Sequence, residues 1–131
     1  MSKWWIYDYV DGRGINDFES WTRSLEKPDQ ARLSQKLRML ENVGSDLPPQ
    51  LLAGPIKNYA HIYKMRINGR VALRPLLCKG PINNDQEFTL LKGATEMDRK
   101  LEPRNAPDIA VVRRGEILLN SARRCNHVRV E

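Results

Sequence analysis

The chain has 131 residues and a mass of 15.2 kDa, which predicts one domain, residues 1–131, around one core. Its 22 basic and 16 acidic residues give a net charge of +6, and such an excess favours a polyanionic partner. No apolar run approaches the roughly 20 residues of a membrane span. The only cysteines are Cys78 and Cys125, and without export features they indicate a reduced, cytoplasmic protein. Cys78 is expected to pack in the core.

The N-terminal segment predicts a strand. Residues 4–10 are apolar and aromatic, and side chains alternate between the two faces of a strand. Trp4 and Trp5 should therefore point to opposite faces. One is expected in the core, and the other half-exposed or at an interface.

Two helices should follow this strand. Asn16 or Asp17 can cap the first helix, because both side chains accept hydrogen bonds from exposed backbone amides. Pro28 suits the first turn of the second helix, and Gly44 suits its end. We expect the two helices to form a hairpin on the sheet.

The second half predicts three strands and a helix. Residues 45–55 should be an extended connection, followed by strands at residues 61–67, 71–78 and 87–94. Asn68-Gly69 favours a hairpin between the first two of these strands, and Pro75 indicates an edge or a bulge. Asn105 can cap a terminal helix, and the tail from Arg123 to residue 131 is expected to fray.

This order of elements predicts an α+β fold. We expect a mostly antiparallel four-stranded sheet with an N-terminal helical hairpin, a C-terminal helix, and the helices on one face. Residues 57–92 carry seven basic and two acidic residues, so most of the net charge lies on the predicted strands. The basic residues are Lys57, Lys64, Arg66, Arg70, Arg74, Lys79 and Lys92.

Two arginines on neighbouring predicted strands form the first candidate site. Arg66 and Arg74 could converge on a phosphate, because guanidinium binds oxyanions bidentately. The alternative is that both are solvated residues of an antiparallel sheet. Arg74 fits this alternative least well, since apolar residues flank it.

The remaining chemistry points away from metals and nucleotide cofactors. The only histidines are His61 and His127, and no Cys/His cluster has the spacing of metal ligands. Attack of a ribose 2′-hydroxyl on its own phosphate needs a base, an acid and cations, but no metal. His61 could serve as the base, or it could be an ordinary surface histidine at the start of a strand.

The ordered strand motifs resemble the RelE/ParE toxin superfamily, in its HigB-like or phage-derived toxin-like branch. The motifs are Tyr63-Lys-Met-Arg66, Ala72-Leu-Arg74 and Phe88-Thr-Leu-Leu-Lys-Gly-Ala94 leading to Pro103, within residues 4–122. The resemblance implies the toxin of a type II toxin–antitoxin system, with a RelE-like fold. Its activity would be metal-independent, cofactor-free cleavage of mRNA, free or on the ribosome, through a 2′,3′-cyclic phosphate.

The resemblance also implies partners and residue roles. The partners would be mRNA, the ribosome and a cognate antitoxin that forms a hetero-oligomer on the basic face. Arg66 and Arg74 would hold the phosphate, and Glu96 or His61 would transfer protons. Support would come from Lys92, Arg99 and Lys100, and further RNA contacts from Lys64, Arg70 and Lys79.

Two alternatives stay open. Where the family has an aromatic residue and then a lysine pair, this chain has Ala94, Glu96 and Met97. That departure favours the same fold acting as a non-nuclease toxin, for example through gyrase inhibition. The second alternative is a non-catalytic regulator of a phage or mobile element that binds nucleic acid or protein.

Overall fold

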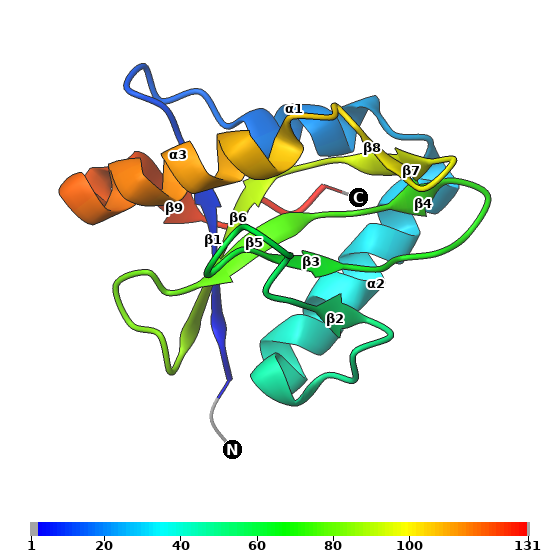
Figure 1. Ribbon diagram of the computed structural model, residues 1–131, viewed down its shortest axis with the longest axis horizontal. Coiled ribbons are helices and arrows are strands. Elements are labelled where there is room, and N and C mark those ends of the chain that lie inside the picture. Colours follow the sequence, from blue (N-terminus) through cyan, green and yellow to red (C-terminus); the bar gives the residue numbers. More distant parts are fainter. Residues whose placement is uncertain (1–2, 131) are drawn as a thin grey trace.

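The computed structural model describes residues 3–130 and shows an α+β chain (Figure 1). Within that range there are three α-helices, two short 3-10 helices and nine strands. None of the helices in these residues has the length and apolar character needed to cross a bilayer. The helices are α1 (Asp17–Ser24), α2 (Lys27–Val43) and α3 (Ala106–Leu119), and the 3-10 helices are η1 (Gly44–Asp46) and η2 (Ser121–Arg123). The strands are β1 (Trp5–Tyr9), β2 (Leu52–Ala53), β3 (Tyr63–Met65), β4 (Ala72–Leu73), β5 (Leu76–Lys79), β6 (Glu87–Lys92), β7 (Thr95–Met97), β8 (Lys100–Glu102) and β9 (Arg124–Asn126).

The strands form two sheets, so the predicted four-stranded, mostly antiparallel sheet is wrong. The larger sheet is mixed and has six strands in the order β2-β3-β5-β6-β1-β9. In it β1 runs parallel to β6, and the chain between these two strands contains α1, α2 and the strands β2 to β5. The smaller sheet has the order β4-β7-β8.

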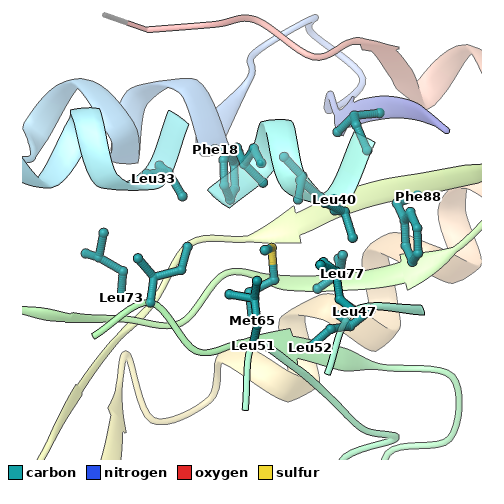
Figure 2. Close-up of a cluster of buried hydrophobic side chains, with 14 residues drawn as sticks. Phe18, Leu33, Leu40, Leu47, Leu51, Leu52, Met65, Leu73, Leu77 and Phe88 are labelled. Carbon is teal, nitrogen blue, oxygen red and sulfur yellow. The ribbon is translucent and has the colours of Figure 1, made fainter. Parts of the chain in front are cut away.

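The predicted helical hairpin on one face is also wrong, because the helices cover both faces of the six-stranded sheet. On one face α1 packs against β1 and β6, and α2 covers a core that reaches β3 and β5 (Figure 2). On the other face α3 packs against β5 and β6. Neighbouring residues of β5 show the reason. Leu77 packs in the core on the side of α1 and α2, whereas Cys78 packs in a second core on the side of α3. The strand therefore needs helices on both sides.

The predicted helix ends are largely confirmed. Asn16 caps α1 by accepting a hydrogen bond from the amide of Glu19 at 2.9 Å, and Pro28 lies in the first turn of α2. Gly44 ends α2 with a φ of +67°, and a side chain there would overlap the Trp4 indole. The two tryptophans diverge as expected. Trp4 stacks on Phe88 at 4.6 Å between ring centroids, whereas Trp5 is exposed.

Several short elements were missed by the sequence pattern. The extended connection contains η1 and β2, and residues 95–102 form the β7–β8 hairpin. The predicted second strand divides at Pro75 into β4 and β5, with a register shift at the start of β5. The tail does not fray over its described part, because β9 pairs with β1. The end of the predicted tail, residue 131, lies outside the described residues.

Candidate active site

Arg66 and Arg74 lie opposite each other on the two neighbouring segments. Flanking backbone hydrogen bonds set this register, from the Met65 amide to the Pro75 carbonyl at 2.9 Å and from the Ile67 amide to the Leu73 carbonyl at 3.1 Å. The two side chains have different environments, however. Arg66 is exposed, whereas Arg74 is buried.

The Arg74 guanidinium is held by three groups of the protein itself. Its Nε donates to Glu96 Oε1 at 3.2 Å, its Nη1 to the Leu73 carbonyl at 2.9 Å, and its Nη2 to Asn68 Oδ1 at 3.1 Å. The Glu96 carboxylate therefore neutralises the positive charge of Arg74, which would otherwise be available to bind a phosphate. In this arrangement Arg74 links the loop after β3 to β7, and Glu96 is its counter-ion.

Lys92 is likewise committed to an ion pair. Its Nζ lies 2.9 Å from Asp17 Oδ2, and Arg113 Nη1 lies 3.0 Å from the same oxygen. Desolvation acts to raise the pKa of Asp17, but the hydrogen bonds from Lys92 and Arg113 outweigh it and hold that pKa below its ordinary value. This three-residue cluster fixes the start of α1 to β6 and α3.

The other predicted RNA contacts are dispersed. Arg99 and Lys100 are exposed at the turn between β7 and β8, and Lys64 is half-buried in β3. Arg70 is exposed and lies 4.0 Å from Glu26. His61 and Lys79 lie together at the other end of β3 from Arg66.

His61 and Lys79 meet in a small pocket with three residues that the sequence interpretation did not select. The pocket is about 90 Å3 and is lined by His61, Tyr63, Lys79, Asn84 and Arg114. They come from the start of β3, the end of β5, the β5–β6 connection and α3. Three of the five side chains are basic or can become so, and none is acidic. We name this set the His61 pocket.

The cations of the His61 pocket are oriented by packing. Lys79 Nζ lies 5.4 Å from the centre of the Tyr63 ring, a geometry in which the ring attracts the ammonium. Arg114 Nε is buried and has no hydrogen-bond partner within residues 3–130. A buried donor without a partner is costly, and Arg114 carries this cost at the wall of the pocket.

The backbone at His61 is unusual. Its φ is +72°, a left-handed conformation that costs a non-glycine residue roughly 1–2 kcal/mol. Such conformations cluster at functional sites, where the surrounding structure holds them. The backbone therefore fixes the position from which the exposed His61 side chain extends at the edge of the pocket.

Arg114 was missed because its role depends on the packing of α3. The adjacent basic pair Arg113-Arg114 in a mostly apolar helix was the available signal. The helix turns the two side chains apart, so Arg113 reaches Asp17 and Arg114 reaches the pocket. Arg114 also lies near Cys78. Burial raises the pKa of the Cys78 thiol to about 12, against the opposing effect of the Arg114 charge.

The second histidine belongs to a separate structural cluster. His127 Nδ1 lies 2.8 Å from the buried Asp8 Oδ1. Asp8 Oδ2 accepts from Asn16 Nδ2 and from the Val128 amide, each at 2.9 Å. Asp8 thus joins the cap of α1 to the C-terminal segment.

Within the described residues, no group of three or more His, Cys, Asp or Glu side chains is placed to hold a metal ion. Comparisons with protein-family models, with curated proteins and with solved structures give no match to this chain. The features of this chain that bear on its function are the His61 pocket and the residue motifs.

Proposed function

We propose that the protein is a metal-independent endoribonuclease, and that it acts as the toxin of a toxin–antitoxin pair. The observation that carries the nuclease proposal is the convergence of His61, Lys79 and Arg114 on one small pocket without an acidic lining residue. The resemblance of the strand motifs to RelE/ParE toxins supports the toxin role. In this proposal Arg66, Arg74 and Lys92 do not form the reactive site, because two of them are held in internal ion pairs.

The size of the pocket matches a phosphate group. A water molecule occupies about 30 Å3 of liquid, so about 90 Å3 accommodates a tetrahedral phosphate but not a whole nucleotide. Lys79 and Arg114 would bind its oxygens through charge-assisted hydrogen bonds. The nucleobases on either side of that phosphate would then lie outside the pocket.

The cleavage chemistry follows from these positions. The ribose 2′-oxygen attacks phosphorus, and His61 takes the 2′-hydroxyl proton as the new P–O2′ bond forms. Lys79 and Arg114 offset the charge on the pentavalent phosphate. The P–O5′ bond breaks, and the departing 5′-oxygen takes a proton from the Tyr63 phenol. The products are a 2′,3′-cyclic phosphate and a 5′-hydroxyl end, and solvent returns the His61 proton to Tyr63.

Cleavage of an end-labelled mRNA fragment, with and without translating ribosomes, tests the nuclease proposal. We expect His61→Gln and Arg114→Gln each to lower the cleavage rate by about 100-fold or more, with EDTA having no effect. Arg104→Gln, which removes an exposed arginine just before α3, should cleave at the wild-type rate. A 2′-deoxy nucleotide at the cut site should block the reaction.

Wild-type cleavage by both pocket variants would contradict the assignment of this site, and intact RNA under all conditions would contradict the nuclease proposal. Growth provides the separate test of the toxin role. Induced wild-type protein should arrest growth, and His61→Gln should not. Normal growth with wild-type protein that cleaves RNA in vitro would refute the toxin role alone.

A further inference from the structure

We propose that a groove beside the start of β1 binds the bases of single-stranded RNA, with Trp5 as the stacking platform. The inference rests on the proposed function, because it places the bases that adjoin a phosphate in the His61 pocket. It adds a second binding site, about 830 Å3 in volume, which we name the Trp5 groove. Its lining residues are Lys3, Trp4, Trp5, Ile6, Glu41, Gln86, Asn126, His127 and Arg129.

Trp5 has the exposure that stacking needs. Its side chain is 63% exposed at the start of β1, whereas Trp4 is occupied by its contact with Phe88. The strand fixes Trp5 in position, because its backbone amide donates to the Gln86 carbonyl at 2.8 Å. An exposed indole on a fixed backbone offers a face to any base, since every base has a π-face.

The Trp5 groove and the His61 pocket lie at the same end of the six-stranded sheet. In the sheet register Trp5 pairs with Glu87, and Lys79 pairs with Phe88. The β5–β6 connection between them contributes Asn84 to the pocket and Gln86 to the groove. One strand, β6, separates β1 from β5, so their backbones lie about 10 Å apart. Trp5 and Lys79 point to opposite faces of the sheet, so a single strand that contacts both sites passes around this end of the sheet at the connection.

The charges around the Trp5 groove suit a polyanion. Lys3 and Arg129 line it together with one acid, Glu41, whereas His127 at its wall is paired with Asp8. Lys3 Nζ lies 3.9 Å from Glu41, with the lysine side chain 72% exposed, and exposed pairs of this kind contribute little. Lys3 can thus turn to a phosphate at small cost.

The polar rim of the groove has groups that can meet base edges. Gln86 and Asn126 are exposed amide side chains beside Trp5, and each has both donors and an acceptor. They can contact the edge of an unpaired base whichever base it is. An RNA duplex would keep its bases stacked inside and could not use the indole, so the inference is specific for single strands.

Binding of a fluorescein-labelled 2′-O-methyl octanucleotide tests this inference, because that RNA binds but cannot be cleaved through its 2′-oxygen. We expect Trp5→Ala to weaken binding by about 5- to 150-fold, the effect of losing one stacked base. Trp5→Phe should retain most of the affinity. The matched control is Met97→Ala, which removes another exposed apolar side chain, 73% exposed in β7, and should bind as the wild type does. A duplex of equal length should bind Trp5→Ala and wild type equally.

The outcomes separate this inference from the nuclease proposal. Weaker octanucleotide binding by Trp5→Ala supports the groove even if the pocket variants prove fully active. Unchanged cleavage of a dinucleotide by Trp5→Ala is also expected, because so short a substrate need not reach the groove. Wild-type affinity of a folded Trp5→Ala protein would overturn the inference. So would a shift from dimer to monomer in sedimentation with RNA binding unchanged, since the groove would then be a contact between copies of the chain.

Discussion

Arg124 holds Glu87 through two parallel hydrogen bonds, from Nη1 to Oε1 and from Nη2 to Oε2, each 3.1 Å long. The two side chains are only 11% and 9% exposed, so both charges depend on this pairing. The guanidinium also lies 4.0 Å from the centre of the Tyr7 ring. Through these contacts the last strand is tied to β6 across β1, next to the connection that joins the two proposed binding sites.

Loss of this pair should be strongly destabilising. Arg124→Met leaves the Glu87 carboxylate buried without its cation, and we expect the free energy of unfolding in urea to fall by about 3–5 kcal/mol. The double variant Glu87→Met with Arg124→Met should recover much of that loss, because no unpaired charge remains. A single variant that loses less than about 1 kcal/mol would show that the pair behaves as an exposed one.

Arg66 and Arg74 should respond differently to truncation, although they lie opposite each other. Arg74→Ala leaves the partly exposed Glu96 without its counter-ion and the Leu73 carbonyl without its donor, and should lower the free energy of unfolding by about 1–3 kcal/mol. Arg66→Ala removes an exposed side chain and should stay within about 0.5 kcal/mol of wild type. Urea unfolding of the two variants makes the comparison. Equal stability of both would contradict the structural role of Arg74.

The Asp17 cluster should make stability depend on pH in the acid range. Because Lys92 and Arg113 hold the pKa of Asp17 below its ordinary value of 3.8, the folded state favours the carboxylate. The stabilisation is fully present above the unfolded pKa and is lost as pH falls through the folded one. The stability difference between wild type and Asp17→Asn should therefore be constant near neutral pH and shrink below about pH 4. A difference that grew on acidification would contradict this sign.

The two cysteines should differ in reactivity toward a thiol reagent. Burial raises the pKa of the Cys78 thiol to about 12, and the thiolate is the reactive form. Cys125 is half-buried, and its pKa is also raised, by burial and by the Asp8 charge. With Ellman's reagent at pH 8, we expect slow reaction of Cys78→Ser and no reaction of Cys125→Ser until the protein is unfolded. Rapid labelling of native Cys125→Ser would contradict the burial of Cys78.

The α-helices were largely predictable because their signals are local. The Asn16 cap, Pro28 in a first turn and Gly44 at an end each act on backbone groups a few residues away. The position of Arg66 and Arg74 on two neighbouring segments was also predictable, from the Asn68-Gly69 turn between them. Short strands such as β2 and β9 were not predictable, because two or three residues carry too little pattern and gain their structure from a partner distant in the chain.

The candidate site divides in the same way. His61 and Lys79 could be selected from the sequence, since residue type and local charge mark them. That Arg114 lines the same pocket could not be predicted, because it requires α3 to cover the second face of the sheet. The ion pairs of Arg74 and Lys92 could not be predicted either, since Glu96 and Asp17 become their partners only in the folded chain.

The sequence by itself therefore determined the helices, the basic excess on the later strands and the divergence of Trp4 and Trp5, all consequences of composition and of repeats of two or 3.6 residues. Only the tertiary structure decided the strand order, the two-sided core, and which cations are neutralised internally. The physical reason is that a charge is satisfied by whatever lies within a few ångströms of it. Packing sets that neighbourhood, and it brings together residues as distant in the chain as His61 and Arg114.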